Sequence, residues 1–158
     1  MRGKEADLQR LFHIVRWCKK LQFIHDDART YEDFIAKKNH RLVELSVFYI
    51  GQIGEHARNL SEEMRTTLSD VQWKQIIAMR NKLIHNYDEI RTNIVWIVIT
   101  EDAPILAERC LEVLRAENSN IDEEIREYLA EETGIILEGE NVREDTGDSE
   151  LPAADDRK

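Results

Sequence analysis

Proline, glycine and cysteine are scarce in this sequence, and each shortage excludes a class of protein. With two prolines and six glycines in 158 residues, the chain is neither collagenous nor a low-complexity linker. Its two cysteines are too few for the disulfide framework of a small secreted domain. Both fall in helical patterns without metal-ligand spacing. We therefore expect buried thiols, a cytoplasmic protein, and no bound metal or cofactor.

Long apolar runs are also missing. No stretch approaches the length of a membrane span, and residues 1–4 lead into polar residues rather than a signal peptide, so we expect no membrane association. Leucine, isoleucine, glutamate, arginine and alanine are abundant instead, which favours an all-α protein. The length suits one ordinary domain with an appendage.

The net charge of −10 is concentrated at one end of the chain. Residues 1–116 hold 17 acidic and 18 basic side chains, whereas residues 117–158 hold 15 acidic and 4 basic ones. The nearly neutral first part neither excludes nor indicates RNA binding. We expect a helical domain over residues 1–116 and an acidic extension over 117–158, largely disordered apart from a short helix from Ile121 to Ala130.

Apolar residues recur at helical spacing in four long segments, over residues 7–25, 39–60, 71–85 and from 92 onward. Two shorter helices are expected over 30–38 and 61–67. Four main helices with short connections make an antiparallel bundle the default. Helix caps are predicted at Thr30, at Ser61, at Ser69 with Asp70, and at Thr92 or Asn93.

Other residues predict how these helices are shaped and packed. Pro104 should kink the last helix near residues 99–100. Gly51 and Gly54 lie in the middle of the second long helix, where glycine is costly, and indicate close approach of another element. The side chains predicted to face inward from the third and fourth long helices are Ile76, Ile77, Met79, Leu83, Ile84, Ile94, Val95, Ile97, Val98, Ile105, Leu106, Cys110, Leu111 and Leu114.

Arg80, Asn81 and His85 crowd one end of the third long helix. Asn81 and His85 are four residues apart and share a face, with Arg80 about 100° round from Asn81. Arginine offers a fixed cationic fork for phosphate, and histidine titrates near neutral pH. The group is suited to phosphoryl chemistry without a metal. Side chains at this spacing are also often solvated or locally paired, and the residues alone do not decide between these interpretations.

Glu55 and His56 follow Gly54 directly in the second long helix. The Glu55 carboxylate could orient His85, cap a neighbouring helix, or simply be exposed. We expect His56 to be a packing or surface residue rather than a ligand.

The spacing of Arg80, His85 and Tyr87 resembles the signature of the HepT-like toxins of the HEPN superfamily. The similarity covers roughly residues 8–115 and departs at His56, where a small residue is usual. It is also carried by residues 53–55, 73–81, 94–96 and Pro104. The resemblance implies an all-α, HEPN-like bundle of four to five helices that forms a homodimer through the helix carrying the motif.

The resemblance further implies a toxin of a toxin–antitoxin pair that cleaves RNA without a metal, using the RNA's own 2′-hydroxyl. Arg80 and His85 would be the catalytic residues and Asn81 a supporting one. The implied partner is a nucleotidyltransferase antitoxin of the MNT type, which would transfer AMP to Tyr87. The alternatives are a non-catalytic binding module that docks this partner and, for Tyr87, a core aromatic.

Overall fold

The computed structural model describes residues 2–85 and 91–144, with side chains described over 3–85 and 91–132. The chain divides into two compact units, Met1–Asp122 and Glu123–Lys158. The described residues form helices and no strand, so the prediction of an all-α fold is confirmed. No described helix is long and apolar enough to cross a membrane.

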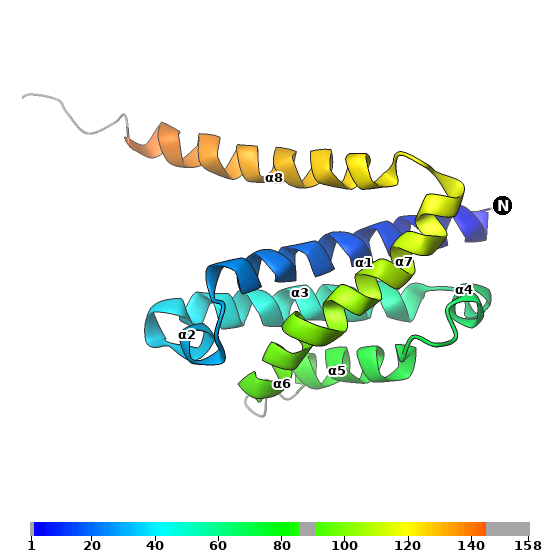
Figure 1. The fold of residues 1–158 in the computed structure, drawn as a ribbon, viewed down its shortest axis with the longest axis horizontal. Coiled ribbons are helices and arrows are strands. Elements are labelled where there is room, and N and C mark those ends of the chain that lie inside the picture. The colour runs from blue at the N-terminus through cyan, green and yellow to red at the C-terminus, as the bar shows by residue number, and fades with distance from the viewer. Residues whose placement is uncertain (1, 86–90, 145–158) are drawn as a thin grey trace, which may run out of the picture. The chain divides into compact units, whose positions relative to one another are not determined.

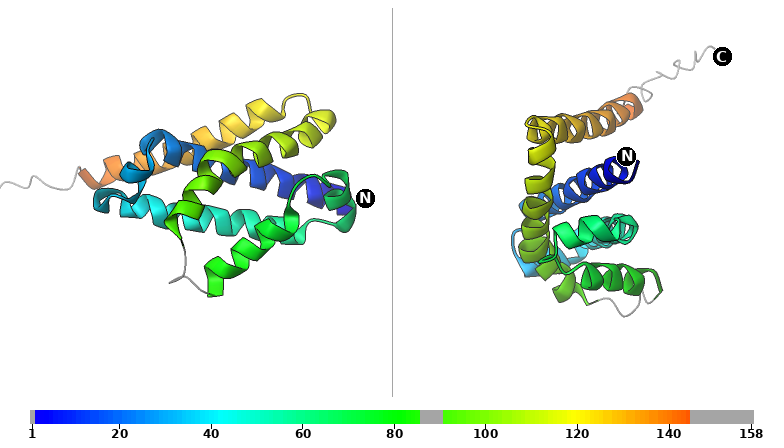
Figure 2. Two further views of the ribbon diagram at one scale, coloured as in Figure 1. Left: turned by 60° about the horizontal axis from the view of Figure 1, so that its bottom comes forward. Right: turned by 90° about the vertical axis from the view of Figure 1, so that its right-hand side faces the viewer.

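The first unit is a helical bundle in which α1, α3 and α5 lie side by side, with α3 in the middle and neighbours antiparallel (Figure 1). The helix α7 crosses this row and packs on α1 (Figure 2). The elements of this unit are α1 (Arg2–Asp27), α2 (Tyr31–Ile35), the 3-10 turn η1 (Lys37–Asn39), α3 (His40–Asn59), α4 (Glu62–Thr67), α5 (Trp73–His85), α6 (Thr92–Ile97), the π-helical turn η3 (Val98–Asp102) and α7 (Ala103–Glu117).

The core of this unit is formed by the apolar stripes of α1, α3 and α7, as their periodicity predicts. Its members include Leu11, Ile14, Val15, Leu21, Ile50, Ile53, Ala57, Leu106 and Leu111, all buried. Cys18 and Cys110 are also buried and free. Burial raises the pKa of the Cys18 thiol, and it raises the pKa of Cys110 to about 12. Both thiols are therefore protonated and unreactive.

The helix caps predicted at Thr30 and Ser61 are confirmed. The Thr30 hydroxyl accepts a hydrogen bond from the Asp33 amide at 3.1 Å, and the Ser61 hydroxyl accepts one from the Met64 amide at 3.1 Å. The buried carboxylate of Asp7 accepts a further bond from the Ser61 amide at 2.9 Å. This bond ties α1 to the start of α4.

The other two predicted caps are wrong, because long-range partners take the side chains. The helix α5 begins at Trp73, and Asp70 pairs instead with Arg109 of α7 at 2.8 Å. The helix α6 begins at Thr92 without a side-chain cap, and the Thr92 hydroxyl lies 2.8 Å from that of Tyr31.

Before Pro104, where the sequence predicts a kink, the structure has the π-helical turn η3. Pro104 lies in the first turn of α7, where its missing N–H costs little. The π-helical turn over Val98–Asp102 is wider than an α-helical turn and joins α6 to α7. Within it, the Thr100 hydroxyl donates to the Trp96 carbonyl at 2.9 Å.

The helix α8 (Ile121–Glu144) begins at the end of the first unit and continues through the described part of the second. The sequence prediction was wrong to end this helix at Ala130, because glutamate and leucine continue to favour helix beyond it. The predicted disorder of residues 145–158 lies outside the described residues.

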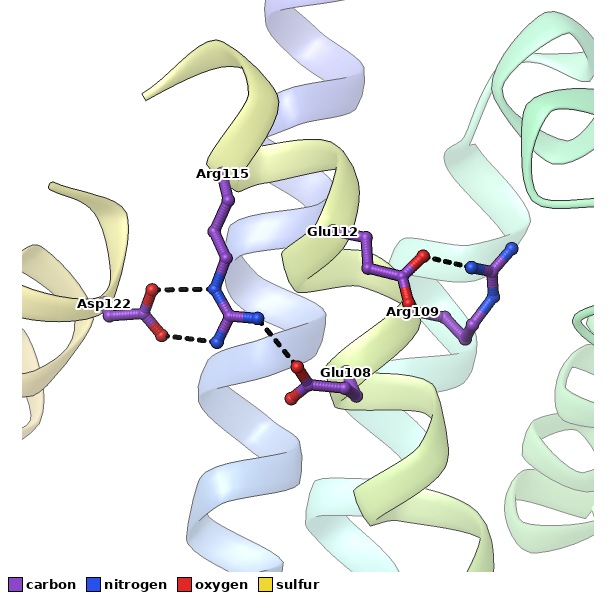
Figure 3. A network of polar contacts seen from close by, with 5 residues as sticks. All are labelled: Glu108, Arg109, Glu112, Arg115 and Asp122. Atoms are coloured by element: carbon purple, nitrogen blue, oxygen red, sulfur yellow. Dashed lines mark hydrogen bonds and ion pairs between the residues drawn. The ribbon is translucent and has the colours of Figure 1, made fainter. Parts of the chain in front are cut away.

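Arginine side chains on α7 organise two ion-pair groups (Figure 3). Arg115 bonds Glu108 at 2.7 Å and Asp122 at 2.8 Å, which holds the first turn of α8 to α7. The hydrogen bond from Arg115 lowers the pKa of Asp122. Arg109 pairs with Glu112 and also with Asp70, which connects α7 to the segment leading into α5.

Candidate active site

Three of the predicted site residues lie on one unbroken helix. The helix α5 runs from Trp73 to His85, so Arg80, Asn81 and His85 keep regular helical spacing. Trp73 and Leu83 anchor the helix in the core. Tyr87, like Asp88 one turn beyond His85, lies outside the described residues.

The helices α3 and α5 touch at Gly54. A Cβ atom added there would lie 2.2 Å from the Cβ of Arg80 and 3.3 Å from the Ile76 carbonyl oxygen. The absent side chain therefore leaves the space that the stem of Arg80 fills. The predicted close approach is confirmed at Gly54 and is wrong at Gly51, where an added Cβ would meet nothing within 4 Å.

The guanidinium of Arg80 lies against α3 and is paired there. Its Nη2 is 2.9 Å from Oε2 of Glu55, and the Arg80 side chain is only 18% exposed. Its Nη1 donates to Oδ1 of the adjacent Asn81 at 3.1 Å. Of the roles considered for Glu55, the structure supports none in the form expected: the carboxylate pairs with Arg80 rather than with His85.

The Glu55 carboxylate is itself held from the next turn of α3. Nδ2 of Asn59 donates to Oε1 of Glu55 at 3.2 Å and to the Glu55 carbonyl at 2.9 Å. A polar row thus runs from Asn59 through Glu55 and Arg80 to Asn81. Sequence reasoning missed Asn59, although its position four residues after a candidate carboxylate was the available signal.

His85 is exposed at the end of α5, and no hydrogen bond joins it to another described residue. Five residues of helix place His85 about 140° round the axis from Arg80. Arg80 faces α3, whereas His85 shares the exposed face of Asn81. A single chain therefore presents the two predicted catalytic groups in different directions.

Several apolar residues of α5, α6 and α7 are uncovered. Ile84, Ile94, Ile97 and Ile105 are 53%, 44%, 44% and 66% exposed, so the prediction that all four pack inward was wrong. Periodicity identified the apolar faces correctly, but in the described chain no neighbouring element covers these positions.

A groove of about 370 Å³ opens between α3, α5 and the segment from α6 to α7. Its walls are mainly apolar, and Ile94 and Ile105 form part of them. Asp70, Asp102 and Arg109 supply its charged lining. Uncovered apolar surface of this kind marks an interaction site more often than a solvated one.

His56 stacks on His13 of α1, with ring centroids 5.2 Å apart, which agrees with the packing role expected for it. Burial lowers the pKa of His56, and the neighbouring His13 and Arg16 lower it further while Glu55 opposes them. The ring is therefore mainly neutral at neutral pH.

Among the described residues, no group of three histidine, cysteine, aspartate or glutamate side chains could hold a metal.

Residues 11–113 match the family described as "Ribonuclease HepT-like", a region that includes α5 and its neighbours. A protein of Caldanaerobacter subterraneus subsp. tengcongensis, provisionally named an RNase, is 35% identical over 109 residues, covering 68% of this chain and 93% of that protein. A protein of Methanocaldococcus jannaschii, also provisionally named an RNase, is 34% identical over 74 residues, covering 47% of this chain and 66% of that protein. A protein of Thermococcus cleftensis, provisionally named ribonuclease HepT, is 29% identical over 76 residues, covering 48% and 67%. No solved structure matches the chain.

Proposed function

Because the chain belongs to the HepT-like ribonuclease family, as the sequence resemblance predicted, we propose that it is a metal-independent endoribonuclease with Arg80 and His85 as its catalytic residues. The observation that carries this proposal is the placement of Arg80. Its guanidinium is held at the edge of α3 beside Asn81. Arg80 also belongs to α5, the helix that ends at the exposed His85.

In the proposed reaction, His85 accepts the proton of the RNA 2′-hydroxyl, and the oxygen attacks the adjacent phosphorus. The bond to the 5′-oxygen breaks, that oxygen takes up a proton from solvent, and His85 returns to solvent the proton that it accepted. The products are a 2′,3′-cyclic phosphate and a 5′-hydroxyl. A histidine suits this proton transfer because its ordinary pKa lies near the working pH.

Arg80 and Asn81 would bind the non-bridging phosphate oxygens. Arg80 retains N–H donors beyond those directed at Glu55 and Asn81, since a guanidinium carries five. Asn81 uses its Oδ1 to accept from Arg80, which leaves its amide N–H groups to donate to phosphate. Fixed donors of this kind stabilise charge that grows in the transition state.

We place two such sites at a homodimer interface formed through α5. Ile84, which precedes His85 directly, is exposed, and so are Ile94 and Ile97 of α6. A second copy that covered Ile84 would exclude water from the neighbouring imidazole. A twofold arrangement is the commonest way to bury one shared face. His85 of one copy could then act on a phosphate held by Arg80 of the other.

The test is incubation of the purified protein with RNA, with and without EDTA. We expect cleavage that EDTA leaves unchanged, with 2′,3′-cyclic phosphate ends. His85→Ala and Arg80→Ala should each lower the rate on the order of a hundredfold or more, with little change in melting temperature. Lys74→Ala is the matched control, an exposed cation on the same helix. If both site variants cleaved RNA as fast as the wild type, the active site would lie elsewhere.

We further propose that this ribonuclease is a cytoplasmic toxin neutralised by an MNT-type nucleotidyltransferase antitoxin that transfers AMP to Tyr87. The phosphodiester formed would add negative charge seven residues after Arg80 in the sequence. Tyr87→Phe should stay toxic and resist neutralisation, and intact-mass measurement should show AMP increments on the wild type alone. Equal modification of the Phe variant would remove Tyr87 from this role.

The second candidate function is a non-catalytic module that docks the nucleotidyltransferase, and the apolar groove beside α5 favours it. The two functions differ in the RNA assay. Tight partner binding without any RNA cleavage would support the module and contradict the nuclease.

A further inference from the structure

We propose that Glu55 is a positioning residue for Arg80, held in turn by Asn59 and seated by Gly54, so that the guanidinium meets the RNA phosphate in one fixed orientation. This inference rests on the proposed ribonuclease function and assigns a role to residues outside the motif. In this role Glu55 orients Arg80 for the RNA phosphate and does not compete with the RNA for the guanidinium.

The first support is that each part of the row is held by the next. Glu55 pairs with Arg80 at 2.9 Å, Asn59 holds the other carboxylate oxygen at 3.2 Å, and Arg80 donates to Asn81 at 3.1 Å. These contacts restrain both terminal nitrogens of the guanidinium, Nη1 and Nη2. An arginine at a helix surface without them would sample many rotamers of its long stem.

The second support is the seat beneath the arginine stem. Gly54 lets the Cβ of Arg80 approach to a distance that no side chain on α3 would allow. The guanidinium is therefore brought beside the carboxylate of the very next residue of α3. Glycine in a helix interior is costly, and the contact with Arg80 gives that cost a reason.

The third support is that the ion pair between Glu55 and Arg80 adds little to the stability of the fold. The Glu55 side chain is 38% exposed, although its paired oxygen Oε2 is buried, and ion pairs at partly exposed positions contribute little to stability. The pair is therefore poorly placed to hold α3 and α5 together, which the apolar core already does. A fixed donor, in contrast, needs no reorganisation as charge develops on the phosphate.

A competing role for Glu55 gives the opposite sign. If the carboxylate only masked Arg80, removing its charge would free the guanidinium, so RNA binding would tighten and cleavage would quicken. If Glu55 positions Arg80, removing its charge slows cleavage without loosening the bound RNA. The two roles are separated by one substitution.

The experiment compares wild type, Glu55→Gln, Asn59→Ala and Glu62→Gln, the last being an exposed glutamate of α4 as the matched control. For Glu55→Gln we expect an unchanged melting temperature. Binding of an RNA with a 2′-deoxy cleavage site should stay within about twofold, and kcat should fall on the order of tenfold to a hundredfold. Asn59→Ala should lower kcat less, and Glu62→Gln should leave it unchanged. An unchanged kcat in Glu55→Gln, or faster cleavage with tighter binding, would overturn the proposal.

A second measurement does not depend on cleavage. The Arg80 Nε–H signal, assigned by its loss in Arg80→Lys, reports guanidinium rotation by NMR. We expect slow rotation in the wild type and faster rotation in Glu55→Gln. If the wild type cleaves no RNA, the proposed function fails, and this signal still decides whether Glu55 fixes Arg80. Equal rotation in both proteins would refute the positioning role.

Discussion

The two faces of α5 differ in how their polar residues are held. Toward α3, Arg80 lies over Gly54 and is paired with Glu55, with its side chain mostly buried. On the outward face, Asn81, Ile84 and His85 are exposed, and the described chain offers His85 no hydrogen-bond partner. One of the two groups proposed as catalytic is thus positioned by the fold of a single chain. The other waits for a second surface, which a partner copy or the RNA would supply.

The largest effect is expected where the inward face is broken. Gly54→Ala would place a methyl group 2.2 Å from the Cβ of Arg80, and that atom belongs to a stem close to the backbone that cannot simply rotate away. Helix α5 must shift. Overpacking of this kind costs about 1–3 kcal/mol, and we expect RNA cleavage to fall with it. Urea unfolding and a cleavage assay measure the two effects.

The matched control for that substitution lies three residues away. At Gly51 an added Cβ meets nothing within 4 Å, so Gly51→Ala should stabilise the protein by roughly 0.5–1 kcal/mol through helix propensity. Similar effects of the two substitutions on stability and cleavage would contradict the close packing of Arg80 on Gly54.

A smaller effect on stability, but a large one on assembly, is expected on the outward face. Ile84→Glu places a charge on an exposed side chain, so the fold of one chain should change little. If a homodimer forms through α5, the buried charge should dissociate it. Light scattering at micromolar concentration should report about twice the chain mass for the wild type and one chain mass for the variant. Dimers of equal stability would show that α5 is not the interface.

The smallest effect concerns the α1 side of α3. Burial lowers the pKa of His56 below its ordinary 6.5, so the unfolded chain takes up a proton before the folded protein does. Stability should therefore fall as the pH drops below about 6.5, until it reaches the folded pKa, where the loss levels off. Arg10, His13 and Arg16 oppose protonation and Glu55 favours it.

His56→Gln should weaken that pH dependence, as measured by melting temperatures at about pH 7.5 and 5.5, values on either side of the ordinary histidine pKa. The control is His40→Gln, because the His40 side chain is 72% exposed. The same pH slope in wild type and His56→Gln would rule out His56 as the group responsible.

Sequence patterns predicted those features that depend on neighbours within one turn. The caps at Thr30 and Ser61 are local, and the apolar stripes follow from the helical repeat. Partners far apart in sequence were not predictable. Asp70 was predicted to cap α5 because nothing near it in the sequence indicates its actual partner, Arg109 on another helix. The pairing of Glu55 with Arg80 was missed for the same reason. Periodicity also cannot tell whether an apolar face such as that of Ile84 is covered.

Both native thiols lie in the core with raised pKa values, and the sequence has no other cysteine. The folded protein should accordingly be almost invisible to maleimide reagents. A single Lys74→Cys substitution would then accept a spin label at one known place on α5 without any change to the two native cysteines. If the proposed homodimer forms, pulsed electron paramagnetic resonance on that labelled protein would measure the distance between the two labels, because neither native cysteine would take up the reagent.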